Sequence, residues 1–162
     1  MIIKLIGSAM LLGFALLATK AYKKCIARRQ SECDVFLTMI DAVRDGVDYF
    51  LSPAAKIFRR FAEGNSRPAA FAKMVIDGVS PGEAFARIKN SLAVGREGRE
   101  ILGKFFESFG RGFKDGAVAM SEDCKKKFSE YSERCEVEDE KNTRLATALM
   151  LGGALGVIIL FL

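Results

Sequence analysis

The sequence contains no histidine and no tryptophan, and it has only three prolines among 162 residues. Without histidine the chain has no imidazole base, no Ser-His or Cys-His nucleophile pair and no His-ligated metal. The commonest catalytic devices are therefore excluded. We assign no catalytic residue and no cofactor.

The four cysteines form no recognisable metal or disulfide motif. They stand at positions 25, 33, 124 and 135, with no C-x-x-C pair and no zinc-knuckle spacing. Cys124 and Cys135 lie eleven residues apart, about three helical turns, so we expect both on a buried stripe as small hydrophobic residues. No metal site is predicted.

Charged residues are absent from residues 145–162, LATALMLGGALGVIILFL. An α-helix rises ~1.5 Å per residue, so this segment would span roughly 27 Å, close to the hydrocarbon core of a bilayer. Residues 1–19 are similarly apolar and are interrupted only by Lys4, which can extend to the interface. A cleaved signal peptide is the rival interpretation, but here the positive charge follows the apolar run. We predict two transmembrane helices, 1–19 and 145–162.

Basic residues collect on the inner side of each predicted span. Positive charge next to a span stays in the cytoplasm. We therefore expect residues 20–144 to form a cytoplasmic domain, with both chain ends outside. The membrane-flanking basic residues are Lys20, Lys23, Lys24, Arg28, Arg29, Lys141 and Arg144.

Small residues recur within both predicted spans. Gly152 and Gly156 form a G-x-x-x-G pair, and Ala9 and Gly13 form a similar pair. Such spacing lets helix backbones approach closely in lipid, although ordinary glycine and alanine usage explains it equally well. These four residues are candidates for helix packing, within one chain or between copies.

The region between the spans has the 3.6-residue apolar period of amphipathic helices, which predicts an all-α fold. The first helix should continue to about Phe50. A short helix from Ser52-Pro53 to Glu63 should follow, and then another from about Pro68 to Gly78.

Ser80-Pro81-Gly82-Glu83 is the clearest helix start, because Ser80 can accept from the N3 amide while Glu83 reaches back in a capping box. A fifth helix should follow the glycine-punctuated VGREG stretch, and residues 110–116 should form a loop. The apolar stripe from Ala117 to Cys135 predicts a long charged helix that runs into the second span. The phenylalanines at helical spacing should form the core of a small bundle.

The middle of the chain is its basic region, since residues 53–116 carry twelve basic and seven acidic side chains. Such a surface can face anionic lipid, an acidic protein or nucleic acid. No recognition motif with interleaved aromatic residues accompanies the charge, so we expect no nucleic acid. The carboxylates of residues 130–140 are interpreted as a solvated helix face.

The order of these features resembles the stage III sporulation protein AB family over essentially the whole chain. The ordered set, rather than any single motif, carries the resemblance. It comprises the anchor with trailing basic residues, Ser52-Pro53 before AAKIFRRFA, Gly78 before Glu83-Ala84-Phe85, ILGKFFESFG, the long charged helix and GGALGVIILFL.

The resemblance implies a non-enzymatic platform in the mother-cell membrane. The helical domain of this family is similar to the cytoplasmic F domain of type II secretion and type IV pilus platform proteins, which engage a secretion-type ATPase. The implied partners are stage III sporulation protein AA, as the ATPase, and other membrane proteins of the same complex. The candidate contact residues are Arg96, Arg99 and Arg111.

Two other functions fit the residues. An extracytoplasmic helical binding domain, tethered at both ends, would require the opposite topology and oxidised cysteines. A membrane-bound regulator would instead bind anionic lipid through the basic surface.

Overall fold

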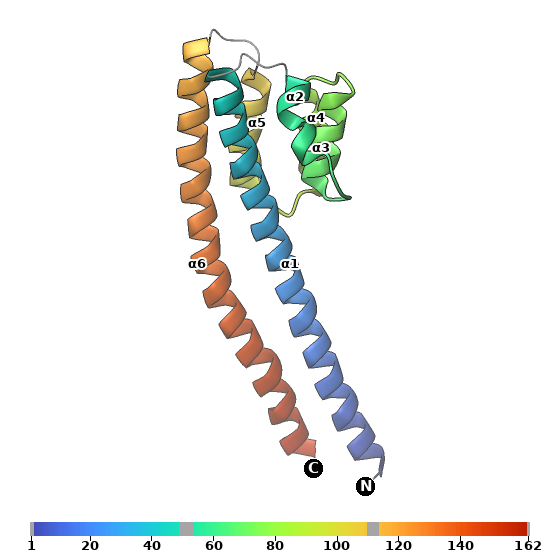
Figure 1. Cartoon of the computed structure of the whole chain (residues 1–162). Coiled ribbons are helices and arrows are strands. Elements are labelled where there is room, and N and C mark those ends of the chain that lie inside the picture. Colours follow the sequence, from blue (N-terminus) through green and yellow to red (C-terminus); the bar gives the residue numbers. More distant parts are fainter. Residues whose placement is uncertain (1, 49–53, 110–113, 162) are drawn as a thin grey trace. The chain divides into compact units, whose positions relative to one another are not determined.

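The computed structural model describes residues 2–48, 54–109 and 114–161, and no strand occurs in these three ranges. The predicted all-α fold is therefore confirmed. The elements in chain order are α1 (Ile2–Asp48), α2 (Ala54–Phe58), the 3₁₀ helix η1 (Arg59–Phe61), α3 (Arg67–Ile76), α4 (Pro81–Ile88), the 3₁₀ helix η2 (Lys89–Ser91), α5 (Arg96–Ser108) and α6 (Lys114–Phe161) (Figure 1).

The chain forms two compact units. The paired-helix unit consists of residues 1–28 and 135–162, and the bundle unit consists of residues 29–134. The long helices α1 and α6 contribute residues to both units.

In the paired-helix unit, parts of α1 and α6 run side by side with the two chain ends at the same end (Figure 1). Among its described residues the buried side chains are Ala15 (7% exposed), Ala154 (5% exposed) and Asp139 (4% exposed). The Thr19 hydroxyl donates to the Ala15 carbonyl oxygen of its own helix (2.8 Å), and its oxygen lies 3.4 Å from Met150 Sδ across the pair. The large apolar side chains are instead exposed, namely Met10, Phe14, Leu16, Leu17, Val137, Leu145, Leu149, Leu155, Val157 and Ile159.

Among the described residues, no helix contains a stretch that is both long enough and apolar enough to cross a membrane. Each predicted span includes positions whose side chains lie outside the description. These positions are 1–6, 8, 9, 11 and 12 in the first span, and 158 and 160–162 in the second. The two spans therefore stay a prediction.

Phenylalanine rings form the core of the bundle unit, as predicted. Phe106, which is 1% exposed, lies at the centre of this cluster. Its ring centroid is 4.6 Å from that of Phe71, 5.3 Å from that of Phe85 and 6.2 Å from that of Phe36. Aromatic pairs at these distances contribute about 0.5–1.5 kcal/mol each beyond the burial of their area. Through this cluster α3, α4 and α5 pack against α1.

Two serines begin helices of the bundle unit. Ser66 Oγ accepts from the Ala69 N–H (3.2 Å) at the start of α3, and Ser80 Oγ accepts from the Glu83 N–H (3.3 Å) at the start of α4. Each serine is followed by a proline in the first turn of the helix. Backbone N–H groups of the first turn make no hydrogen bond within the helix, so the missing N–H of proline costs little there. The Glu83 carboxylate pairs with Arg87 (2.6 Å), so only the serine half of the predicted capping box is confirmed.

Two predicted helix boundaries are wrong. Helix α5 begins at Arg96, inside the VGREG stretch that was expected to precede the helix. Gly95 is the N-cap of this helix. Helix α6 begins at Lys114, so residues 114–116 are helical rather than part of a loop. The predicted Ser52-Pro53 cap and residues 110–113 lie outside the described residues.

Candidate docking groove

A groove with a volume of about 430 Å³ lies between α4 and α5 in the bundle unit. Gly82 on α4 allows the close approach of the two helices that shapes it. A Cβ at position 82 would lie 3.1 Å from the Cα of Glu107, and a Cβ at position 103 would lie 3.6 Å from Cε1 of Phe85. Larger residues at these positions would push the helices apart or fill the groove.

Basic residues predominate around this groove. The charged residues that line it are Lys89, Arg96, Arg99, Lys104, Glu100 and Glu107. Arg96 Nε donates to Glu100 Oε1 at 2.8 Å. This hydrogen bond, with the attraction between the two charges, lowers the pKa of Glu100 and raises the pKa of Arg96. This pair is neutral, and the other charged residues of the lining are Lys89, Arg99 and Lys104 against Glu107, so the groove presents an excess of positive charge.

A hydrogen bond to the first residue of η2 holds Arg99 in place. Its Nη1 donates to the Lys89 carbonyl oxygen at 3.3 Å. The guanidinium has five N–H donors, so this bond fixes its position while leaving donors for a further acceptor. The two arginines predicted to contact a partner, Arg96 and Arg99, therefore line one groove. The third, Arg111, lies outside the described residues.

Two buried side chains hold the segment that leads into α5. Glu32 Oε2 on α1 accepts from the Ala93 N–H at 2.6 Å, and the Tyr131 hydroxyl on α6 accepts from the Gly95 N–H at 2.8 Å. Glu32 and Tyr131 are each 5% exposed. We call this pair of side chains the α5 clamp, because it fixes the start of the helix that carries Arg96 and Arg99.

The role of the two clamp residues was not predicted, although the sequence carries a signal for it. Glu32 precedes Phe36 by four residues and so lies on the buried face of α1. A carboxylate at such a position must find a hydrogen-bond donor, because a buried charge without partners is costly. Tyr131 was placed on the buried stripe of α6, but its hydroxyl was given no partner.

Among the described residues of the predicted small-residue pairs, none meets the other helix of the chain. A Cβ at Gly13, Gly152 or Gly156 would meet nothing within 4 Å. The side chain of Ala9 lies outside the description. The buried small residues of the paired-helix unit are Ala15 and Ala154 instead.

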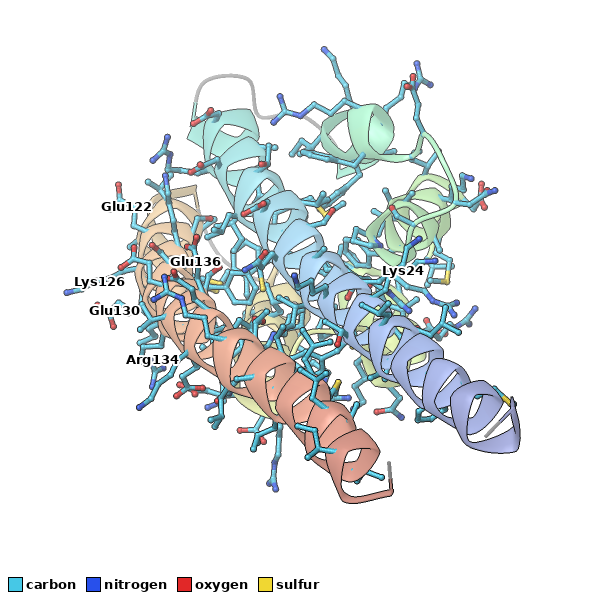
Figure 2. The ribbon with its side chains drawn as sticks, turned by 90° about the horizontal axis from the view of Figure 1, so that it is seen from below. Lys24, Glu122, Lys126, Glu130, Arg134 and Glu136 are labelled. Carbon is cyan, nitrogen blue, oxygen red and sulfur yellow. The ribbon has the colours of Figure 1, made fainter. Side chains whose placement is uncertain are left out.

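The membrane-flanking basic residues all lie on α1 or α6. Six of them are exposed, among them Lys24, which is labelled in Figure 2, and Arg29 is half-buried. Arg144 pairs with Glu140 one turn before it on α6. The other predicted positions in this set are Lys20, Lys23, Arg28 and Lys141.

The four cysteines are free thiols. No group of three or more cysteine, aspartate or glutamate side chains is arranged to hold a metal ion among the residues that the structure describes. Cys33 and Cys124 are buried in the bundle unit, while Cys25 is exposed. Burial raises the pKa of the Cys124 thiol to about 12.

We expect the cysteines to differ sharply in alkylation. At pH 8 a thiol with a pKa near 12 is ionised to about one part in ten thousand, and only the thiolate reacts. In the folded chain, iodoacetamide should therefore modify Cys25 and leave Cys124 unmodified, as measured by peptide mass spectrometry. After denaturation both should react. Equal modification of both cysteines in the folded chain would contradict the burial of Cys124.

These features define a class: an all-helical protein that combines a small bundle, bearing a basic groove, with a pair of long helices whose large apolar side chains are exposed. The family model for stage III sporulation protein AB matches residues 4–162, nearly the whole chain. The chain belongs to this family, which confirms the resemblance seen in the sequence and supports a sporulation-related role. Neither the curated proteins nor the solved structures contain a match to it.

Proposed function

We propose that this protein is a non-enzymatic membrane platform that anchors a cytosolic secretion-type ATPase at the mother-cell membrane during stage III of sporulation. One observation carries the membrane part of this proposal. Among the described residues of the paired-helix unit, the buried apolar side chains are two alanines, Ala15 and Ala154, whereas large apolar side chains such as Phe14 and Ile159 are exposed.

That arrangement is the reverse of what water favours. Phe14 is 74% exposed, Leu17 is 68% exposed and Ile159 is 76% exposed, whereas Ala15 and Ala154 are buried. A helix pair in water would bury its largest apolar side chains, because the gain is about 25 cal/mol per Å². In lipid this gain vanishes, and helices associate through small residues that allow close backbone contact. The pattern therefore supports a lipid environment for this unit.

The ATPase part of the proposal is supported by family membership and by the groove. Residues 20–144 would form the cytoplasmic domain, and the α4–α5 groove gathers Arg96 and Arg99 on one surface of the bundle unit. The platform would act by position alone. It would hold the ATPase beside the other membrane proteins of the complex.

A flotation experiment tests both parts. The full-length chain is reconstituted in phosphatidylcholine vesicles, washed with sodium carbonate at pH 11 and floated on a density gradient with purified stage III sporulation protein AA. We expect the chain to remain with the vesicles after the wash and the ATPase to float only when the chain is present. Loss of the chain in the carbonate wash would reject the membrane platform, and failure of the ATPase to float would reject the partner.

Protease added to intact protoplasts separates the proposal from the alternative in which the domain lies outside the cell. With residues 20–144 in the cytoplasm, the domain should remain intact until the membrane is broken. Cleavage in intact protoplasts would favour the tethered extracytoplasmic domain.

A further inference from the structure

We propose that the α4–α5 groove is the docking site for an acidic segment of the ATPase, which inserts at least one carboxylate between Arg99 and Lys104. This inference rests on the proposed function and gives it a location and a chemistry. The groove volume of about 430 Å³ falls within the range of roughly 300–1,000 Å³ typical of binding pockets. It suits the end of a helix or a few residues of a loop.

The charge of the groove selects an anionic occupant. Lys89, Arg99 and Lys104 line it together with the carboxylate of Glu107, and Arg96 already pairs with Glu100. The Arg99 guanidinium, held by its bond to the Lys89 carbonyl, can give an incoming carboxylate two parallel hydrogen bonds. Because Arg99 is already held in place, less conformational entropy is lost on binding than for a freely mobile arginine.

The shape of the groove selects a protein segment over a lipid surface. Its lining combines this charge with Phe85, Ala86 and the backbone at Gly82 and Gly103. A bilayer surface can meet charges on a convex face, but it cannot follow a concave site between two helices. A peptide segment can place an apolar side chain against Ala86 and a carboxylate against Arg99 at the same time.

A second copy of this chain is a weaker candidate for the occupant. Along one side of α6 its charges alternate at four-residue intervals, from Glu122 through Lys126 and Glu130 to Arg134 (Figure 2). The most acidic stretch, residues 136–140, carries four carboxylates, but Asp139 is buried and Glu140 pairs with Arg144. Opposite charges one turn apart compensate each other on the same helix. Arg134 also pairs with Glu97 on α5 (2.5 Å). Such a face offers a basic groove little net attraction.

The neighbouring groove between α5 and α6 provides a useful contrast. Its volume is similar, about 440 Å³, but its rim mixes acidic and basic side chains. Ion pairs already join them, including Lys127 with Asp123 at 2.6 Å. The α4–α5 groove is therefore the one with charge available for a partner.

The test measures the affinity of the full-length chain, in phosphatidylcholine nanodiscs, for purified stage III sporulation protein AA. The variant R96E/R99E reverses the charge of the groove, and A86W fills it without changing charge. Both alter exposed or half-buried side chains, so folding should persist. We expect each variant to weaken ATPase binding about ten-fold or more, with R96E/R99E also flattening the dependence on salt.

Matched controls carry the same changes elsewhere in the bundle unit. R59E/R67E reverses two exposed arginines outside the groove, and A119W enlarges an exposed alanine of α6. Neither control should change the affinity by more than about two-fold. If all four variants bind the ATPase like the original chain, the groove assignment is wrong while the platform proposal stands. If the original chain does not bind the ATPase, both fail.

Two further measurements decide between occupants. Self-association of the chain is followed by chemical cross-linking, and lipid binding is followed by the shift in affinity when nanodiscs contain anionic phosphatidylglycerol. A loss of cross-linked oligomers in R96E/R99E, with ATPase affinity unchanged, would assign the groove to a second copy and overturn the inference. An effect of the groove variants that appears only with anionic lipid would assign the groove to the membrane surface. This result would also overturn the inference.

Discussion

Replacing Phe106 with alanine should remove about 3–5 kcal/mol from the free energy of unfolding of the bundle unit. Besides Phe36, Phe71 and Phe85, its ring lies near those of Phe58, with centroids 6.4 Å apart, and Phe105, at 5.1 Å. The substitution leaves a cavity at the point where α1, α2, α3, α4 and α5 meet. Domains of this size have a total stability of only about 5–15 kcal/mol, so much of it would be lost.

The measurement is a thermal melt of the full-length chain in detergent, followed by helical circular dichroism, together with hydrogen exchange of peptides from α3 to α5. We expect the melting temperature to fall by more than ~10 °C and exchange to accelerate across these helices. Phe61→Ala is the control, because Phe61 is only half-buried. Similar melting of both variants would mean that Phe106 is not at the centre of the core.

The core and the helices could be predicted because both depend on local periodicity. Phe36, Phe85 and Phe106 lie at helical spacing from other apolar residues, and a stripe of this kind has no stable arrangement in water except burial. The N-cap at Ser80 likewise involves residues only three positions apart. Each of these predictions needs one short stretch of sequence.

The groove could be predicted only in part. The basic character of residues 53–116 drew attention to Arg96 and Arg99, but a groove requires two helices to meet. That meeting depends on Gly82 of α4, where a Cβ would lie 3.1 Å from the Cα of Glu107 on α5. A single sequence gives no sign that this glycine faces the backbone of another helix.

The start of α5 was misplaced for a related reason. Glycines usually mark the ends of helices, so VGREG was expected to precede the helix. Gly98 nevertheless lies inside α5. A residue with a side chain does not fit at this position, because its Cβ would lie 2.5 Å from Cε1 of Tyr131. The close packing of Tyr131, 33 positions away, outweighs the low helix propensity of glycine at this position.

Glu32→Ala should also destabilise the bundle unit, by about 2–3 kcal/mol, and the effect should centre on the start of α5. Glu32 is 5% exposed and its Oε2 accepts from the Ala93 N–H at 2.6 Å. A hydrogen bond to a charged group is worth about 1.5–3 kcal/mol. Alanine leaves the amide of Ala93 without this acceptor and opens a void beside it. Because the other clamp residue, Tyr131, remains, the segment should loosen rather than unfold.

Hydrogen exchange of a peptide covering residues 92–95 measures this loosening directly. Glu32→Gln retains a carbonyl oxygen that can accept from Ala93, so it should restore most of the protection. Asp34→Ala removes an exposed carboxylate two residues along α1 and should leave exchange unchanged. If Glu32→Ala lowered stability evenly throughout the bundle unit, with no added exchange at residues 92–95, Glu32 would be an ordinary core residue. A local effect would instead show that α1 holds the start of the helix that carries Arg96 and Arg99, and should weaken ATPase binding without altering the groove itself.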